Sequence, residues 1–361
     1  MQNTVIERNS NIEFIRIIAI CGVMFLHMNA GKIGLQDAVN RDGSNALALI
    51  LFNAMFIICV DLFMMISGFC GAKKTNIRFS KIIDLIIQTI VVQTIGYLCL
   101  VIFDFEDFSF RSFLKQFIPA NYFVILYSAT YMLSPYINKM IMALSKEKAK
   151  LLLIIIFALF CVAPMFPDFI KNATNSSLDS LSTISLYGSA QGYSIVNFLV
   201  CYTFGSVVGN HEYSFTNKRK LLYTYGILCY SGEILWMYLA RKYLIDPSVS
   251  HAYYSPLVVT MAFIVLLLVQ MKPIKHNRKI NSFARSCFFT YLIHSYLLRI
   301  LFGFIDVHEI AQLNTFLFVL LIIIIITVYS FCVPLYWIYN KTIGMVINKG
   351  ILSRMNYFID I

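Results

Sequence analysis

Long apolar stretches, separated by short polar segments, run through this chain from end to end. Most are close to 20 residues long, enough for a helix rising 1.5 Å per residue to cross a hydrocarbon layer about 30 Å thick. We expect helices, because lipid offers the backbone no hydrogen-bond partner. Runs such as 317–327 do not alternate, which argues against a strand barrel. The pattern predicts ten spans, at 12–30, 46–71, 82–103, 117–137, 151–166, 193–210, 221–240, 253–271, 285–303 and 313–338.

The predicted fold class is therefore all-α, a polytopic membrane protein with a bundle of about ten transmembrane helices. Residues 1–361 are expected to form a single transmembrane domain with no appended soluble domain and no cleaved leader. The longest polar interruption, 167–192, is expected to be an outer loop. No internal repeat is visible in the sequence, which counts against an inverted-repeat transporter.

The distribution of basic residues predicts that both termini face the cytoplasm. With the N-terminus inside, about twenty Lys and Arg residues fall in inner segments and about eight in outer ones, as the positive-inside rule requires. The inner set is Arg8, Lys73, Lys74, Arg78, Lys81, Lys139, Lys146, Lys148, Lys150, Lys218, Arg219, Lys220, Lys272, Lys275, Arg278, Lys279, Arg285, Lys341, Lys349 and Arg354.

The composition argues against a nucleic-acid-binding protein and against a protein built on disulfides or a metal site. The chain is 59% hydrophobic and 13% charged, and its net charge of +11 is accounted for by topology, so we expect no nucleic-acid partner. The nine cysteines fall in or beside apolar stretches without a CxxC spacing, which predicts neither a disulfide framework nor a metal site.

The first span contains the clearest candidate site. Arg16 and His27 are eleven residues apart, which places both on one helix face about 16 Å apart along the axis, and Glu13 lies one turn before Arg16. Charged groups inside a span cost a few kcal/mol unless they face a cavity or a partner, so we expect a polar passage with the imidazole deep within it. The alternative is an interfacial Glu13–Arg16 pair, with His27 at the outer end of the helix.

The second span contains Asp61 about ten residues from its inner end, where an unpaired carboxylate would be costly; Arg16 and His27 are candidate partners. Ser67 and Gly68 permit close helix approach or a kink. The basic residues that follow can bind a phosphorylated ligand, although ordinary topology alone explains Lys73 and Lys74.

Two later spans hold polar residues that are weaker candidates. Tyr122 opens the fourth span and Asn138 closes it, while His294 lies near the middle of the ninth. A single histidine in a helix more often forms a hydrogen bond between helices than takes part in catalysis. Glu233 and Trp236 in the seventh span are weaker still.

These motifs together resemble the membrane-bound acyltransferase-3 family, which transfers acyl groups to cell-surface sugars. The resemblance rests on Asn11-Ile-Glu13-Phe-Ile-Arg16 leading to His27, and on Val60-Asp-Leu-Phe-Met-Met-Ile-Ser-Gly-Phe69, with Met64 in place of the family's second Phe. The Tyr-Phe-Val-Ile, Ser-Pro-Tyr-Ile-Asn and Tyr-Leu-Ile-His elements also fit, so most of the chain is covered.

The resemblance implies an O-acetyltransferase that uses cytoplasmic acetyl-CoA and no metal. It implies His27 as the catalytic general base, Arg16 as its motif partner with Asp61 beside them, and Arg78, Lys74, Lys73 and Ser67 as the site for the CoA end. Glu13, Tyr122, Asn138 and His294 are the expected substrate-binding residues. No Gly-x-Ser-x-Gly elbow occurs, so we expect no serine acyl-enzyme.

The expected acceptor is a surface polysaccharide or its lipid-linked sugar precursor, in a multi-pass protein of the bacterial inner membrane. Membrane lipids and a second copy of the chain are further expected partners. The alternative function is a transporter or polymerase of the same glycan pathway, which also needs ten or more helices and buried charges.

Overall fold

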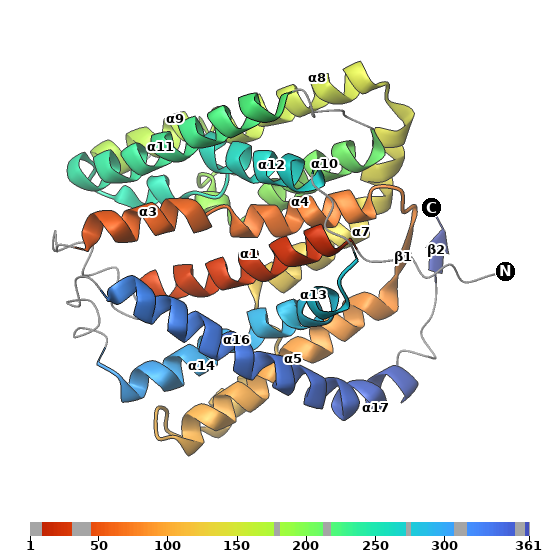
Figure 1. Cartoon of the computed structure of the whole chain (residues 1–361), viewed down its shortest axis with the longest axis vertical. Coiled ribbons are helices and arrows are strands. Elements are labelled where there is room, and N and C mark those ends of the chain that lie inside the picture. Colours follow the sequence, from red (N-terminus) through yellow and green to blue (C-terminus); the bar gives the residue numbers. More distant parts are fainter. Residues whose placement is uncertain are drawn as a thin grey trace. The chain divides into compact units, whose positions relative to one another are not determined.

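The computed structural model describes residues 9–30, 45–176, 181–211, 218–271, 276–306, 316–350 and 358–360, and these form helices almost throughout (Figure 1). The longer helices are α1 (Ser10–Asn29), α3 (Ala46–Phe56), α4 (Cys59–Gly71), α5 (Phe79–Ile102), α7 (Tyr122–Ala143), α8 (Lys146–Phe157), α9 (Met165–Thr174), α10 (Ile195–Asn210), α11 (Arg219–Tyr243), α12 (Pro256–Gln270), α14 (Cys287–Phe304) and α16 (Leu317–Lys341). The shorter elements are α6 (Phe110–Lys115), α13 (Arg278–Phe283), α17 (Ile343–Gly350), the π-helix η1 (Ala158–Val162), the 3-10 turns η3 (Ala190–Gly192), η5 (Pro247–His251) and η6 (Ala284–Ser286), and the strands β1 (Asn76–Arg78) and β2 (Phe358–Asp360).

Each of the ten predicted spans corresponds to helix. The span predicted at 46–71 is divided into α3 and α4, and the one at 151–166 is α8 continued through η1 into α9. Residues 313–315 of the tenth predicted span, and the basic residues Arg8, Lys272, Lys275 and Arg354, lie outside the described residues. Side-chain caps begin several helices: Asn9, Asn121, Ser145 and Ser194 each accept a hydrogen bond from a backbone N–H of the first turn.

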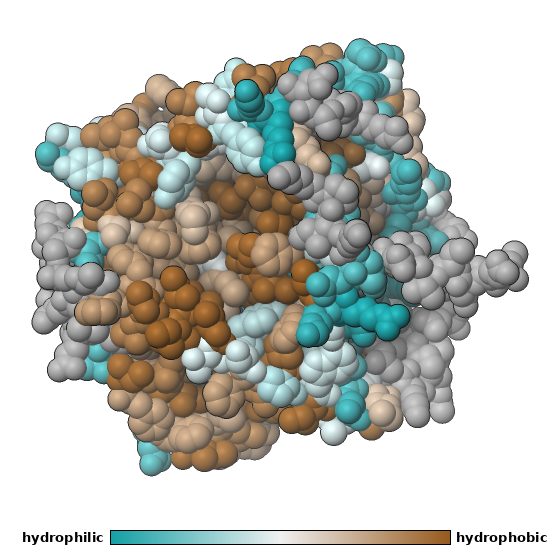
Figure 2. Space-filling model, viewed as in Figure 1, coloured by the Kyte–Doolittle hydropathy of each residue, from teal (hydrophilic) through white to brown (hydrophobic). Residues whose placement is uncertain are grey.

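Within the described residues, seven helical segments are long and apolar enough to cross a membrane. The other three predicted spans are α10, which has 16 residues, and the more polar α7 and α11, which have 22 and 25. Large apolar side chains are exposed on these helices, including Ile154, Ile227 and Ile326, and brown apolar residues cover much of the face in Figure 2. An all-α, polytopic arrangement explains this exposure, because lipid is the solvent for such surfaces.

The chain forms two compact units. Unit 1 comprises Met1–Ala46, Ile83–Ala120 and Val269–Met355, and unit 2 comprises Leu47–Ile82, Asn121–Leu268 and Asn356–Ile361. In unit 1, α1 packs against α13, α14 and α16. The start of α1 is fixed by polar contacts: Ser10 Oγ donates to Asn281 Oδ1 at 3.0 Å, and Asn11 Nδ2 donates to the Val269 carbonyl at 2.9 Å.

In unit 2, α4 and α10 lie in close contact along their lengths (Figure 1). A Cβ added to Gly68 would overlap the Tyr202 carbonyl oxygen, and one added to Gly205 would overlap the Met65 carbonyl oxygen. Gly205 and Gly209 form a GxxxG pair, which allows two helix backbones to approach closely. The prediction that Ser67-Gly68 permits close helix approach is confirmed.

One end of unit 2 gathers three segments that were predicted to lie inside. Asn138 Nδ2 at the end of α7 donates to the Gly71 and Lys74 carbonyls after α4, and Asn210 Nδ2 at the end of α10 donates to the Ala72 carbonyl. β1 in the same region pairs antiparallel with β2, Asn76 opposite Asp360 and Arg78 opposite Phe358. This common end agrees with the predicted alternation of helices and places β2 beside the segments that were predicted to lie inside.

Candidate active site

The predicted site residues divide between the two units. Unit 1 holds Glu13, Arg16, His27 and His294, and unit 2 holds Asp61, Ser67, Lys73, Lys74, Arg78, Tyr122 and Asn138.

The first turns of α1 carry the ion pair between Glu13 and Arg16. Arg16 Nη1 donates to Glu13 Oε1 at 2.8 Å, across one helical turn. Glu13 is buried, with 4% of its surface exposed, while the Arg16 side chain retains 26%. Because the guanidinium neutralises a buried carboxylate and stays partly accessible, Arg16 can still meet an anionic group from outside the helix.

His27 lies in the last turn of α1 and is exposed, and the expectation that it lines a polar passage stays a prediction. The helix ends at Asn29, only two residues later. The predicted alternative, a Glu13–Arg16 pair with the histidine near the helix end, describes the positions better. His27 is nevertheless in contact with an imidazole of another helix: the His27 and His294 ring centroids are 4.9 Å apart and the rings meet edge to face at 68°.

His294 is the buried imidazole of this pair, with 2% of its surface exposed. Its Nδ1 lies 3.0 Å from the Thr290 carbonyl oxygen, one turn earlier on α14. A carbonyl only accepts, so Nδ1 carries the proton in a neutral ring and Nε2 presents a lone pair. Nε2 has no hydrogen-bond partner among the described residues. The ring is thus fixed in one tautomer beside His27.

Two imidazoles of unit 1 that meet edge to face define the candidate centre: the exposed His27 at the end of α1 and the buried, oriented His294 on α14. Sequence reasoning gave each histidine a separate role, because nothing in the spacing shows that their helices are neighbours. A base beside a second group that is fixed in one tautomer is an arrangement that can activate a hydroxyl.

Asp61 in unit 2 is buried at 1% exposure in the first turn of α4, where the helix dipole favours negative charge. Asn197 Nδ2 on α10 donates to Asp61 Oδ1 at 2.9 Å, a partner that the sequence did not indicate. Asp61 Oδ2 has no hydrogen-bond partner among the described residues. Ser67, two turns further along α4, donates its hydroxyl to the Phe63 carbonyl at 2.9 Å.

The segment after α4 presents three exposed cations, Lys73, Lys74 and Arg78. Its backbone is tied to α7: the Arg78 N–H donates to Tyr131 Oη at 3.1 Å, and the Lys74 carbonyl accepts from Asn138. These ties hold the cations in one short region, which suits a phosphate-bearing ligand. Lys81 beside them donates to Tyr127 Oη at 2.8 Å, and its ammonium lies 4.3 Å from the Tyr131 ring centroid.

Asn138 connects the segments of this region through its hydrogen bonds. It is fully buried, and its amide nitrogen donates to Gly71 O at 2.9 Å and Lys74 O at 2.8 Å. Its Oδ1 accepts from Ser206 Oγ at 2.7 Å and lies 3.3 Å from Tyr202 Oη. Two donors and two acceptor positions are the full capacity of an amide, so a substrate contact would have to displace one of these partners. The predicted substrate role of Asn138 stays a prediction.

Replacing Asn138 with aspartate is expected to lower the melting temperature of the detergent-solubilised protein by several degrees. The carboxylate cannot donate to the Gly71 and Lys74 carbonyls, and each buried unsatisfied group costs about 1–3 kcal/mol. Thermal melting followed by size-exclusion fluorescence measures the effect. Asn175→Asp is the matched control, since Asn175 is exposed after α9 in a left-handed conformation that aspartate tolerates. Equal melting temperatures of the two variants would contradict the structural role given to the hydrogen bonds of Asn138.

A tyrosine cluster lies at the start of α7. Tyr122 and Tyr193 have ring centroids 4.9 Å apart, and Tyr193 and Tyr253 have centroids 5.1 Å apart. Tyr122 and Tyr193 are exposed at 38% and 45%, so both side chains are accessible to a ligand. Two of the three residues were not predicted, although adjacent tyrosines beside predicted outer loops were visible in the sequence. Nearby, Tyr254 Oη donates to Asp168 Oδ2 at 2.6 Å, and Ser189 also donates to this carboxylate.

The apolar helices, with polar and charged side chains at their ends and within them, define a multi-pass membrane protein. The family model described as an acyltransferase domain, that of the acyltransferase-3 family, matches residues 9–358. The chain belongs to this family and is a membrane acyltransferase. No curated protein and no solved structure matches it.

Proposed function

We propose that this acyltransferase moves an acetyl group from cytoplasmic acetyl-CoA to a hydroxyl of a cell-surface polysaccharide or of its lipid-linked precursor, in the inner membrane of a bacterium. The observation that carries this proposal is the contact between the exposed His27 and the buried His294, in a chain that belongs to an acyltransferase family. Acyl transfer to a hydroxyl needs a base for the hydroxyl proton, and an imidazole is the side chain best suited to that role near neutral pH.

His27 is the proposed base. Its imidazole takes the proton of the attacking hydroxyl, the hydroxyl oxygen forms the new ester bond to the acyl carbon, and the carbon–sulfur bond of the thioester breaks. The imidazolium then returns the proton to the leaving thiolate, so that a free thiol and an O-acyl ester result. His294 is the proposed positioning residue for this step, since its ring is fixed in one tautomer and lies against the His27 ring.

Two regions of unit 2 are proposed binding sites, one for the acyl donor and one for the acceptor sugar. Lys73, Lys74 and Arg78 are exposed cations at the end predicted to be cytoplasmic, and they are the proposed ligands of the CoA phosphates. Tyr122 and Tyr193, packed in front of the buried Tyr253, form the proposed surface for the sugar, because aromatic faces bind the apolar faces of sugar rings. Arg16, about 16 Å along α1 from His27, is the proposed contact for an anionic group of the donor.

The test is acetyl transfer in membrane vesicles. Vesicles that contain the protein, supplied with [14C]acetyl-CoA and the host's surface-glycan precursors, are expected to accumulate label in the glycan or lipid-linked sugar fraction. Mild alkali should release this label as acetate, as it does from an ester. Vesicles from the same strain without the protein are the control. If loss of the protein changes glycan length or location and leaves the ester label unaltered, a transporter or polymerase is the correct assignment.

A further inference from the structure

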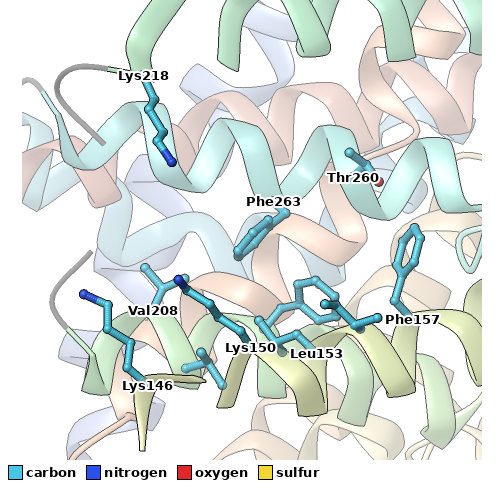
Figure 3. A pocket seen from close by; sticks show the side chains of 11 residues that line it. Lys146, Lys150, Leu153, Phe157, Val208, Lys218, Thr260 and Phe263 are labelled. Atoms are coloured by element: carbon cyan, nitrogen blue, oxygen red, sulfur yellow. The ribbon is translucent and has the colours of Figure 1, made fainter. Parts of the chain in front are cut away.

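Unit 2 contains a pocket of about 520 Å³ that the proposed acyl transfer does not use. Helices α8, α10 and α12 line it, together with Lys218 at the start of α11 (Figure 3). Its volume lies within the range that binds small ligands.

The two ends of the pocket differ in chemistry. Lys146, Lys150 and Lys218 bring their ammonium groups to one end, and Phe157 and Thr260 lie at the other, with Leu153 and Phe263 between them (Figure 3). On α8 the lining residues recur at spacings of three and four, which places them on one helix face. A ligand that fits has an anionic head and an apolar tail.

The depth of the pocket matches one leaflet of a bilayer. Lys146 and Phe157 are eleven residues apart on α8, or about 16 Å at 1.5 Å per residue. Half of a hydrocarbon layer about 30 Å thick is about 15 Å. The lysines lie at the same end of unit 2 as Lys73, Lys74 and Arg78, because α8 follows directly on α7, whose last turns hold Asn138. This end is the one predicted to be cytoplasmic.

The lining argues against CoA as the occupant. Among the described residues that line the pocket, Thr260 is the only one besides the three lysines with a polar side chain. The adenine ring and the two amides of CoA would be left without hydrogen-bond partners, at a cost for each buried group. A sugar on a lipid-linked acceptor would meet the same difficulty. Lysines act as point charges for phosphate, which a simple lipid headgroup satisfies.

We propose that this pocket is a binding site for an anionic glycerophospholipid of the inner leaflet. The headgroup phosphate lies among Lys146, Lys150 and Lys218, and one acyl chain lies along Leu153, Phe157 and Phe263. Basic pockets between transmembrane helices at the cytoplasmic side bind anionic headgroups in this way. Glu147, on the same turn as Lys146, is exposed and does not line the pocket, but it interacts electrostatically with Lys146 and Lys150. Three lysines against this one carboxylate leave the described part of the cationic end with a net positive charge.

The experiment compares phosphatidylglycerol with phosphatidylcholine, added to the full-length protein in detergent and followed by native mass spectrometry and thermal melting. We expect selective retention of phosphatidylglycerol and a higher melting temperature in its presence. The variant Lys150→Gln/Lys218→Gln should bind phosphatidylglycerol at least about tenfold more weakly, since each lysine near an anionic headgroup contributes a factor of about five. Lys148→Gln/Lys220→Gln, which removes two exposed lysines of the same segments outside the pocket, should bind like the parent protein.

Equal binding of the two lipids, or equal loss in both double variants, would overturn the proposal. So would displacement of the lipid by CoA at micromolar concentration, because it would assign the pocket to the acyl donor. The readouts are lipid retention and melting, so they stand whether or not acetyl transfer is observed.

Discussion

Replacing His27 with alanine is expected to reduce acyl transfer by about 10²- to 10⁴-fold, the usual contribution of a positioned general base. The imidazole is exposed near the end of α1, so its removal leaves no buried cavity and the protein should insert and melt normally. The measurement is alkali-labile acetate incorporated into the glycan fraction, normalised to the amount of protein in the membrane.

Two further variants are needed for comparison with His27→Ala: a control histidine and the neighbour of the proposed base. His276→Ala, at an exposed histidine just before α13, should transfer acyl groups at the parent rate. His294→Asn should lower kcat with little change in KM for the donor, since it alters the neighbour of the base and not the proposed phosphate ligands. Normal acetate content in the His27→Ala strain would contradict the proposal that His27 is the catalytic base.

Replacing Gly205 with alanine is expected to destabilise unit 2 strongly. The added Cβ would overlap the Met65 carbonyl oxygen and come 2.9 Å from the Phe69 nitrogen, so α4 and α10 would have to move apart along a buried interface. Overpacking of this kind costs about 1–3 kcal/mol, and rigid backbone atoms cannot yield as a side chain can. A fall of several degrees in melting temperature, with less protein recovered from the membrane, is the expected result.

Gly232→Ala on α11 is the matched control, with an effect of opposite sign. A Cβ there meets only Leu257 methyl groups, the nearest at 3.5 Å, which is ordinary contact. Alanine is a better helix former than glycine by about 1 kcal/mol, so this variant should melt at the same temperature or higher. Similar destabilisation by both substitutions would show that the close approach of α4 and α10 is not what makes Gly205 necessary.

The spans were predictable from sequence because lipid imposes a single, strong requirement. An apolar stretch near 20 residues long has few alternatives to a helix, and all ten predicted spans correspond to helix. Interruptions within a span were not predicted. The division between α3 and α4 at 57–58 involves isoleucines, with no proline or glycine to mark it.

The chemistry of the site was predictable by residue type and less so by partner. The Glu13–Arg16 ion pair follows from a spacing of three on one helix, which is a local property. The partners of Asp61 and His27 come from distant helices, Asn197 on α10 and His294 on α14. No spacing along the chain encodes which helices pack together, so arginine and histidine were chosen as partners of Asp61 by charge alone.

Asn138 illustrates a different difficulty. An asparagine near a helix end in a family motif reads as a ligand-binding group, and the structure gives all its hydrogen-bonding capacity to neighbouring protein groups. Two of those partners are the backbone carbonyls of Gly71 and Lys74, and nothing in the amino-acid sequence indicates that Asn138 contacts them. A residue can therefore be required by the site through its contacts with α10 and with the segment that carries Lys73, Lys74 and Arg78.

The pairing of β1 with β2 joins Asn76–Arg78 to Phe358–Asp360. A ladder of this kind is made by main-chain groups, which every residue except proline supplies equally. The ladder therefore constrains the main chain of β1, and the exposed side chains of Asn76 and Arg78 can be exchanged for any residue except proline without loss of its hydrogen bonds.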